Sequence, residues 1–407
     1  MTIKVWADGT SAGLLGTNGP RGAAFAYAPE ARPSEAVSLT MPVRLASWDS
    51  DFGLPPIFEM NLPEGVLRDR LRMAFAKATG TFDDLDLLAI VGRSQVGRLR
   101  YTNEFAELDQ LVPFQSVDEL LASRWDGNLF QYLLEKFALY SGVSGVQPKL
   151  LIRDDEAWGE PAKASERASV QGATHIVKFW EDQYPQLAAN EFFCLRAAEN
   201  CGLVVPRYRL SDDARALVID RFDLRADGRY RGLEDFCVLN ARRTTDKYLG
   251  SYETAVLKRF REFASPGQVA SGSEAIFRML ALNAAVRNGD AHLKNFGVLY
   301  DYVDGEVALA PVYDVVTTTA YIRADQMALT LGGTTRWPTA KQLLAFGTSR
   351  QIGSPSALKA MLELIADGVS EVMAEMRAYI KTHPDFREIG TRMLGQWEEG
   401  ISTSLMS

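Results

Sequence analysis

The stretch Asn288-Gly289-Asp290-Ala291-His292-Leu293-Lys294-Asn295 decides how this chain is interpreted, together with the later Asp314 in Pro-Val-Tyr-Asp. Aspartate and asparagine are common in turns, so the stretch could be only a loop between a helix and a strand. The alternative is a phosphoryl-transfer site. There, one carboxylate accepts the proton of an attacking hydroxyl, while an amide oxygen and a second carboxylate hold Mg²⁺ on nucleotide phosphates.

The surrounding sequence favours the second interpretation. Asp290 and Asn295 have the Asp-x-x-x-x-Asn spacing of a protein-kinase catalytic loop, although N-G-D replaces the usual H-R-D. Residues 275–286 are almost all apolar and predict a buried helix. The buried helix would be followed by a polar loop, an F-G-V-L-Y strand and Asp314. This order would place the three polar side chains of Asp290, Asn295 and Asp314 at one edge of a core.

Composition excludes several classes of protein. The chain has 407 residues, enough for two or three subdomains, and 47% hydrophobic residues, which is usual for a globular protein. The net charge of −8 argues against extensive direct binding to nucleic-acid backbones. The best candidate for a local basic patch is Ala241-Arg242-Arg243 with Lys247, more simply interpreted as a solvated or nucleotide-facing loop.

Cysteine, histidine and hydropathy patterns predict a cytoplasmic protein. The three cysteines show no C-x-x-C spacing, which indicates reduced, buried thiols. The chain has only three histidines, which argues against a histidine-based metal centre. The N-terminus has no apolar signal region, and no stretch has the roughly 18 apolar residues that a membrane span needs.

Periodicity predicts an α+β fold with two lobes around a cleft. Short strands are expected at I-K-V-W, A-A-F-A-Y-A and V-S-L-T-M-P in residues 1–48, joined by turns such as D-G-T. Further elements are expected as follows: helices at 63–79, 83–91, 127–140, 186–201, 357–382 and 389–401; strands at 150–152, 174–179, 207–210 and 215–219; an exposed loop at 153–172. We therefore divide the chain into 1–110, 111–235 and a mostly helical 236–407.

Three further segments could bind a nucleotide. Residues 141–149 are small enough for the backbone N–H groups of residues 143–147 to approach phosphates. A plain hairpin turn is the default interpretation of such a glycine-containing loop. Lys178 lies in an apolar strand, so its ammonium group needs a partner. It could form a structural ion pair. Alternatively, it could contact nucleotide phosphates while Glu191 positions the ammonium group. Asp220-Arg221-Phe222 follows an apolar run and could form a hinge against adenine.

The chain resembles the HipA serine/threonine kinases, the toxins of HipA/HipB toxin–antitoxin modules. The resemblance covers essentially the whole chain and rests on these motifs: F-A-Y-A-P-E, S-L-T-M-P, N-L-P-E-G-V-L-R-D-R-L, I-V-G-R-S-Q-V-G, S-G-V-Q-P-K, T-H-I-V-K, N-E-F-F-C-L, G-L-V-V-P, D-R-F-D, E-D-F-C, N-G-D-A-H-L-K-N-F and Y-D. It implies a two-lobed, protein-kinase-like fold with a small N-terminal α+β subdomain and a mostly helical C-terminal lobe.

The resemblance also implies roles for individual residues. Asp290 would be the catalytic base, and Asn295 and Asp314 would be the Mg²⁺ ligands. His292 would lie in the catalytic loop with a structural role. The ATP-binding set would comprise Val143, Ser144, Gly145, Val146, Gln147, Lys178, Asp220, Phe222 and His292.

The implied biology is growth arrest by phosphorylation of protein serines, with aminoacyl-tRNA synthetases as the best-known targets of the family. ATP and Mg²⁺ would be the cofactors. A small helix-turn-helix antitoxin would bind the kinase, and DNA would be reached mainly through that antitoxin.

One position departs from the family pattern. Relatives commonly carry an autophosphorylated serine where this chain has Gly142, although some carry a serine at the position of Ser144. A phosphate here would add about −1.5 to −2 charge beside the nucleotide phosphates and eject the loop. We expect self-inactivation through Ser144 rather than Ser141, unless both are plain loop serines.

Two other functions fit part of the sequence. Aminoglycoside-type small-molecule kinases also use a G-D-x-x-x-x-N loop, but the N-terminal block resembles the HipA subdomain. The N-terminal block is residues 1–110. A pseudokinase corepressor would have no need for the complete set of Lys178, Asp290, Asn295 and Asp314.

Overall fold

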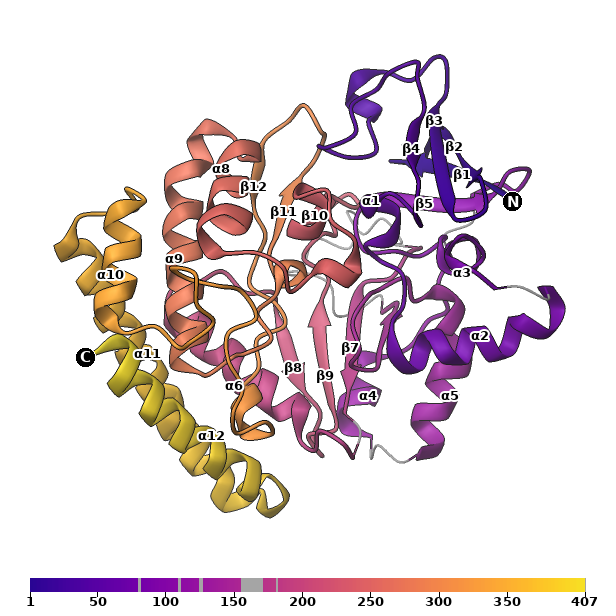
Figure 1. Cartoon of the computed structure of the whole chain (residues 1–407). Helices are drawn as coiled ribbons and strands as arrows, with labels where there is room; N and C mark the ends of the chain where they lie inside the picture. The colour runs from indigo at the N-terminus through magenta and orange to yellow at the C-terminus, as the bar shows by residue number, and fades with distance from the viewer. Residues whose placement is uncertain (80–81, 109–110, 124–126, 155–170, 181, 407) are drawn as a thin grey trace. The chain divides into compact units, whose positions relative to one another are not determined.

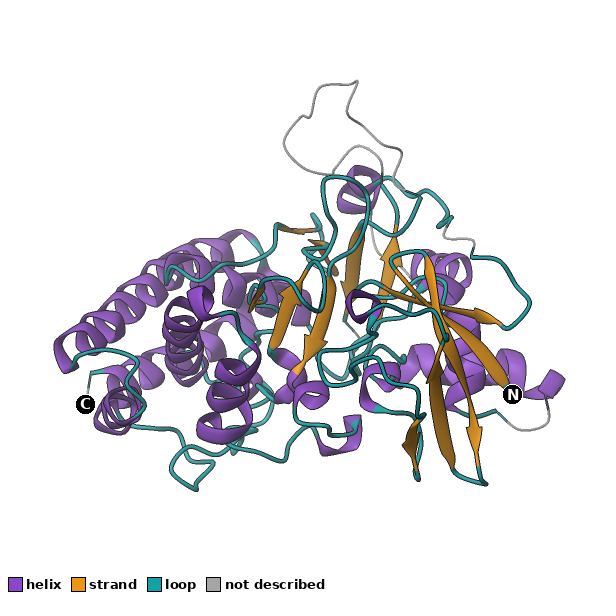
Figure 2. Ribbon diagram, turned by 90° about the horizontal axis from the view of Figure 1, so that it is seen from above, coloured by secondary structure: helices purple, strands orange, loops and turns teal. Residues whose placement is uncertain are grey.

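Two compact units make up the described part of the chain. The structure, a computed structural model, describes residues 1–79, 82–108, 111–123, 127–154, 171–180 and 182–406. The first unit comprises Met1–Phe179, Ser211–Thr244 and Leu299–Val307; the second comprises Trp180–Leu210, Thr245–Val298 and Ala308–Ser407. Helices and strands are mixed along the chain, which confirms the predicted α+β class (Figures 1 and 2).

The first unit begins with a five-stranded antiparallel sheet in the order β4-β3-β2-β1-β5 (Figure 1). Its strands are β1 Thr2–Ala7, β2 Thr10–Asn18, β3 Gly22–Tyr27, β4 Trp48–Ser50 and β5 Leu99–Asn103. Asp8 and Gly9 join β1 to β2 with φ of 51° and 79°, the backbone that a two-residue hairpin turn requires. The sequence therefore predicted this turn correctly.

The strand predicted at V-S-L-T-M-P was wrong. The segment forms only an isolated bridge between Ser38 and Met41. The Ser38 hydroxyl accepts from the Thr40 backbone N–H at 3.0 Å and donates to Glu234 Oε2 at 2.8 Å. Such side-chain hydrogen bonds compete with the backbone hydrogen bonds of a regular β-sheet, and serine commonly forms them in turns.

A second antiparallel sheet in the first unit contains the strands predicted at 150–152, 174–179 and 215–219. These are β6 Lys149–Ile152, β7 His175–Phe179 and β9 Ala216–Asp220, with β7 paired to both neighbours. The helices of this unit are α1 Pro56–Glu59, α2 Gly65–Thr79, α3 Asp84–Val91, α4 Val117–Ala122, α5 Gly127–Phe137 and α7 Phe236–Leu239. The exposed loop predicted at 153–172 lies mainly outside the described residues.

Helix α3 shows why the sequence predicts helix boundaries well in this unit. The Asp83 side chain accepts from the backbone N–H groups of Leu85 and Asp86, and Asp86 returns the bond to Asp83 N. This reciprocal capping satisfies N–H groups that no helical carbonyl can reach. At the other end, Gly92 is the C-terminal cap.

The second unit is mostly helical (Figure 2). Its main helices are α6 Leu187–Asn200, α8 Arg259–Phe263, α9 Val269–Ala285, α10 Ala340–Ser349, α11 Pro355–Thr382 and α12 Arg387–Gly400, with strand β8 Tyr208–Leu210. Helix α9 is buried along most of its length, as its apolar sequence predicted, and it packs against α6, α11 and α12. It ends immediately before the catalytic-loop motif.

The remaining elements are short. They are strands β10 Gly232–Asp235, β11 Gly297–Tyr300 and β12 Val307–Leu309, and helical turns Pro33–Glu35, Ala138–Tyr140, Thr244–Asp246, Tyr252–Lys258, Pro266–Gln268, Leu293–Asn295, Thr318–Ala320, Pro384–Phe386 and Ile401–Leu405. Strand β11 is the F-G-V-L-Y strand that the sequence predicted. Among the described residues, no helix is long and apolar enough to cross a membrane.

Candidate functional site

The catalytic-loop motif lies in the second unit, directly after α9. Helix α9 ends at Ala285, and Arg287 adopts a left-handed backbone with φ of 57°, so the chain turns sharply away. Asn288 then binds back to the helix: its backbone N–H donates to Asn283 O and its side-chain Nδ2 to Asn283 Oδ1, both at 2.9 Å. The first residue of the motif therefore fixes the loop to a buried helix.

Position 289 requires glycine because another segment of the chain passes close to its Cα atom. Its N–H donates to Thr318 Oγ1 at 2.8 Å. A Cβ at this position would lie 2.6 Å from Gln326 O and would overlap the Asp325 carboxylate. Only glycine lets the loop pass this backbone without displacing it.

Asp290 lies at the surface with one carboxylate oxygen held. Its Oδ1 accepts from the Tyr248 hydroxyl at 2.8 Å, and its backbone N–H donates to Asn288 Oδ1 at 3.1 Å. Desolvation by the surrounding protein raises the pKa of Asp290 to about 6. The charges of Asp314 and Asp325 also raise this pKa, whereas the hydrogen bond from Tyr248 and the charge of Lys247 lower it. A carboxylate with this pKa is largely ionised at neutral pH but more basic than an ordinary aspartate.

Asn295 and Asp314 are brought together. Asn295 Nδ2 donates to Asp314 Oδ2 at 3.2 Å, and Asn295 Oδ1 accepts from the His292 backbone N–H at 3.0 Å. Asp314 has a left-handed backbone with φ of 61°, which is uncommon for a non-glycine residue and clusters at functional sites. The structure therefore brings these two predicted ligands together, and their role in holding Mg²⁺ stays a prediction.

The backbone following Asp314 is anchored by residues from two helices. Asn190 in α6 donates to Thr317 O at 3.1 Å and accepts from Thr317 N at 2.8 Å. Trp397 in α12 donates from Nε1 to Thr317 Oγ1 at 2.7 Å. Asn190 belongs to the N-E-F-F motif, so this motif supports the Asp314 segment, a role that the sequence did not reveal.

His292 is a buried residue of the same loop. Burial lowers its pKa to about 4, and the positive charge of Lys247 acts in the same direction. The imidazole is therefore neutral near pH 7.

Among the described residues, no group of three or more His, Cys, Asp and Glu side chains is arranged to hold a metal. Asn295 and Asp314 supply an amide and one carboxylate, a smaller oxygen-donor pair of the type that Mg²⁺ accepts alongside water and phosphate.

The predicted phosphate loop lies in the first unit. Ser141 is fully buried: its Oγ donates to Phe137 O at 2.8 Å and accepts from Leu151 N at 2.9 Å. Ser144 is partly exposed and Val146 is 65% exposed. Gly145 has φ of 118°, and Gln147 Nε2 donates to Phe179 O at 3.0 Å. The loop thus has a buried start, an open middle and a tethered end.

Lys178 has a second lysine directly opposite. Lys149 in β6 pairs in register with Lys178 in β7, and both are at most 6% exposed. Lys149 also reaches the phosphate loop, because a Cβ on Gly145 would lie 3.1 Å from Lys149 Cε and would overlap its Nζ. Sequence reasoning missed Lys149.

The predicted hinge follows the end of β9 at Asp220. His175 Nε2 lies 3.3 Å from Asp220 Oδ1, across the β7–β9 pair. Arg221 is buried and donates from Nε to Asp223 Oδ1 at 3.0 Å. Phe222, by contrast, is only partly buried, so it retains surface that could contact a ligand.

The segment Ser94–Gly97 of the N-terminal block contacts both the predicted phosphate loop and the predicted hinge. Gly142 N donates to Ser94 O at 2.9 Å, and Val96 N donates to Gly142 O at 3.2 Å. On the hinge side, Arg221 Nη2 donates to Gln95 O at 3.0 Å and Gly97 N donates to Asp223 Oδ2 at 2.7 Å. Composition gave no indication of this role.

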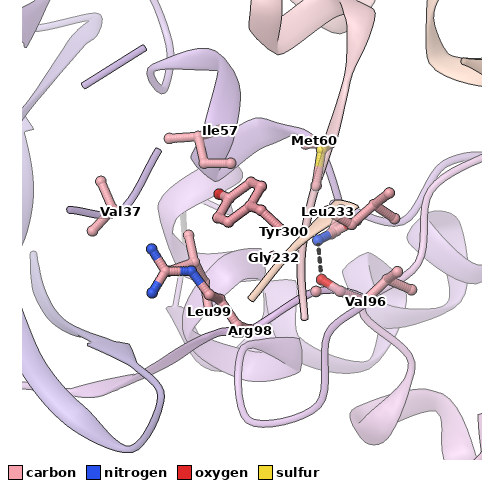
Figure 3. A pocket seen from close by; sticks show the side chains of 11 residues that line it. Val37, Ile57, Met60, Val96, Arg98, Leu99, Gly232, Leu233 and Tyr300 are labelled. Carbon is pink, nitrogen blue, oxygen red and sulfur yellow. Dashed lines mark hydrogen bonds between the residues drawn. The ribbon is translucent and has the colours of Figure 1, made fainter. Parts of the chain in front are cut away.

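A small pocket lies beside the Ser94–Gly97 segment, within the first unit. Asn61 Nδ2 donates to Val96 O at 2.7 Å (Figure 3). The residues that line the pocket are Val37, Ile57, Met60, Asn61, Val96, Gly97, Arg98, Leu99, Gly232, Leu233 and Tyr300. Nearby, the buried Glu234 accepts from Ser38 Oγ at 2.8 Å and from Tyr300 Oη at 2.5 Å. This pocket therefore belongs to the packing of the N-terminal block on β10.

The predicted site residues fall into two groups. Asp290, His292, Asn295, Asp314 and Glu191 lie in the second unit. The first unit contains Lys178, Asp220, Phe222 and the loop 143–147. The Lys178–Glu191 pairing stays a prediction, as do the functional roles of all these residues.

Two family models match this chain. One describes a HipA-like C-terminal domain and matches residues 141–378; the other describes a HipA N-terminal domain and matches residues 3–102. The first covers more than half of the chain. The protein therefore belongs to the HipA family.

Curated relatives and one solved structure agree with this assignment. Two proteins of Sinorhizobium fredii, named "Putative kinase Y4dM" and "Putative kinase Y4mE", are 30% and 28% identical over 68% and 92% of this chain, respectively. The matched part spans 65% of the first relative and 91% of the second. HipA in the HipA, HipB and operator DNA complex of Shewanella oneidensis is 20% identical, with a TM-score of 0.69 and 98% of each chain covered. That likeness confirms the predicted HipA-like fold.

Proposed function

We propose that this HipA-family protein is an ATP- and Mg²⁺-dependent serine/threonine protein kinase that acts as a growth-arresting toxin. The observation that carries the proposal is the Asn295–Asp314 hydrogen bond in the unit that also presents Asp290 at the surface. The relatives' names support a kinase as the general class.

Asp290 would accept the proton of the substrate hydroxyl. Its raised pKa, about 6, leaves it ionised at neutral pH and basic enough to take a proton in the transition state. In the proposed reaction the hydroxyl oxygen bonds to the γ-phosphorus, the β–γ bridging bond breaks, and ADP leaves. Ser and Thr hydroxyls need such a base because they are weak nucleophiles when neutral.

Asn295 and Asp314 would hold the metal, and the first unit would hold the phosphates. The Asn295 Oδ1 has a second lone pair beyond the one used by His292 N, and Asp314 is a hard anionic donor. Bound Mg²⁺ would supply charge neutralisation of the transferring phosphoryl group. Lys178, Lys149 and the N–H groups of residues 143–147 would contact the phosphates, with Asp220 and Phe222 at the adenine.

The partners would be a HipB-like helix-turn-helix antitoxin and a protein of the translation apparatus, such as an aminoacyl-tRNA synthetase. The similar Shewanella structure is a complex of HipA, HipB and operator DNA. A net charge of −8 disfavours extensive contact of this chain with DNA, so DNA would be reached mainly through a basic antitoxin.

Self-inactivation would act through Ser144. Ser141 is buried with its hydroxyl engaged twice, whereas Ser144 is partly exposed in the open middle of the loop. Incubation of the wild type with ATP followed by mass-spectrometric phosphosite mapping tests this. An unmodified Ser144 in a protein that phosphorylates its substrate would contradict it.

The central experiment is transfer of label from γ-labelled ATP to candidate synthetases by the wild type and by Asp290→Asn, which keeps the size of the side chain. We expect protein labelling by the wild type and a loss of about a thousand-fold or more in the variant. Equal labelling by both would refute Asp290 as the base. Label found in a small molecule would favour an aminoglycoside-kinase-like enzyme, and no transfer at all would favour a pseudokinase corepressor.

A further inference from the structure

Tyr248 lies outside every motif that identified the site, yet it contacts the catalytic loop closely. Its hydroxyl donates to Asp290 Oδ1 at 2.8 Å. Its ring meets the His292 ring edge-on, with centroids 5.2 Å apart and an interplanar angle of 77°. The preceding residue is tied to the same loop, because Leu293 N donates to Lys247 O at 3.0 Å.

These contacts fix the orientation of Tyr248 relative to Asp290. The backbone bond at Lys247 sets the position of the segment, and the ring contact with His292 sets the direction of the phenol. Tyr248 is 50% exposed, so it lies at the surface from which a substrate hydroxyl would approach Asp290. All of these residues belong to the second unit.

The hydrogen bond makes the two oxygens of Asp290 different. A carboxylate can rotate about its terminal bond, and a general base needs one oxygen aligned with the proton that it accepts. Tyr248 engages Oδ1. Among the described residues, Oδ2 accepts no hydrogen bond from the protein, so it is the oxygen available to a substrate.

We propose that Tyr248 is a positioning residue that holds Oδ1 of Asp290 so that Oδ2 accepts the proton of the substrate hydroxyl. This proposal rests on the proposed kinase function. The Tyr248 proton stays on the phenol throughout. The substrate proton moves to Oδ2 while the substrate oxygen bonds to the γ-phosphorus and ADP leaves.

Tyr248 also affects how readily Asp290 ionises. The groups that face Asp290 are Tyr248, Lys247, Asp314 and Asp325. The Tyr248 bond and the Lys247 charge lower the pKa of Asp290, whereas desolvation by the surrounding protein and the two carboxylates raise it to about 6. Removal of the phenol hydroxyl therefore raises the pKa of Asp290 above its present value, because the ionised form loses a donor.

The test is the variant Tyr248→Phe, which keeps the ring and its contact with His292. We expect kcat for protein phosphorylation to fall about ten-fold, the KM for ATP to stay within about two-fold, and the acid limb of the pH–rate profile to move to higher pH. Tyr132→Phe is the matched control. Tyr132 is similarly exposed, at 53%, but lies on α5 in the first unit, and its substitution should change neither kcat nor the acid limb.

Two outcomes would overturn the proposal. An unchanged kcat and acid limb in Tyr248→Phe would show that the bond has no positioning role. A higher kcat would show instead that the phenol competes with the substrate for Asp290.

A measurement without turnover separates this proposal from the kinase proposal. In protein labelled with ¹³C at the aspartate carboxyl carbons, the Asp290 signal is assigned by its loss in Asp290→Asn. We expect its titration midpoint to be higher in Tyr248→Phe than in the wild type, with Tyr132→Phe unchanged. An inactive wild type would refute the kinase proposal alone, whereas identical midpoints in an active enzyme would refute the Tyr248 proposal alone.

Discussion

At the scale of single residues, the site depends on side chains held in uncommon local geometry. Asp314 has φ of 61° and accepts a hydrogen bond from Asn295, so its backbone and its carboxylate are both constrained. Asparagine tolerates the left-handed region better than most residues, because its short polar side chain can bond locally. This difference allows the charge of Asp314 to be tested separately from its backbone.

We predict that Asp314→Asn folds normally but loses phosphoryl transfer by about a hundred-fold or more, because a neutral amide binds Mg²⁺ more weakly than a carboxylate. Thermal unfolding and transfer rates at several Mg²⁺ concentrations measure the two effects. Asp314→Ala should be less stable than Asp314→Asn, because alanine fits the left-handed backbone poorly. Full activity of Asp314→Asn would remove Asp314 from the proposed metal site.

The pKa of Asp290 predicts a pH dependence. The ionised carboxylate is the active form of a base, and desolvation by the surrounding protein raises its pKa to about 6. The rate should therefore be nearly constant above that pH and fall about ten-fold for each pH unit below it. Rates between pH 4.5 and 8 with saturating ATP would test this. An acid limb near the ordinary aspartate value of about 4 would contradict the proposed environment.

At the scale of elements, the sequence predicted regular structure well and contacts between segments poorly. Helices α2, α3 and α6 follow from apolar spacing and caps, which are local signals. The Asn295–Asp314 contact was predictable because a short strand joins the two residues. By contrast, Tyr248, Lys149 and Gln95 act through partners 42, 29 and 126 residues away, respectively, or through register across a sheet. No local pattern carries that information.

The predicted phosphate loop shows such a non-local constraint at Gly142. This residue is bonded on both sides to Ser94 and Val96. A Cβ here would lie 2.7 Å from Ser94 O and 2.6 Å from Gln95 Cδ. Relatives commonly have serine at this position, whereas this chain has Gly142. The close packing around Gly142 leaves no room for a serine side chain in this loop conformation.

We predict that Gly142→Ser lowers the free energy of unfolding by about 1–3 kcal/mol, the usual cost of overpacking. Urea denaturation measures the change. Gly267→Ser is the control, because Gly267 is exposed and has open space around its Cα, and it should have little effect. If the two variants lose the same small amount, the loop is not packed as described.

At the scale of the whole molecule, residues of the N-terminal block supply hydrogen bonds to the proposed nucleotide-binding part of the first unit. Buried Arg221 and Asp223 receive partners from Gln95 and Gly97, and buried Glu234 receives them from Ser38 and Leu39. An unsatisfied buried polar group costs about 1–3 kcal/mol, so several together approach the total stability of a typical domain, about 5–15 kcal/mol.

We predict that residues 104–407 expressed alone are unstable and aggregate, and that co-expression with residues 1–103 restores a soluble complex. Size-exclusion chromatography and thermal unfolding of both preparations measure this. A monomeric 104–407 fragment with the thermal stability of the full chain would show that the N-terminal block is an independent appendage.

The bonds of Ser94–Gly97 to both the loop and the hinge make this segment a thermodynamic link between the N-terminal block and the proposed nucleotide site. A partner that draws Ser94–Gly97 away from Gly142 would weaken nucleotide binding at the proposed site. Reciprocity of coupled equilibria then requires that nucleotide weaken the hold of that partner by the same factor. A surface far in sequence from Asp290 would thereby sense whether ATP is bound.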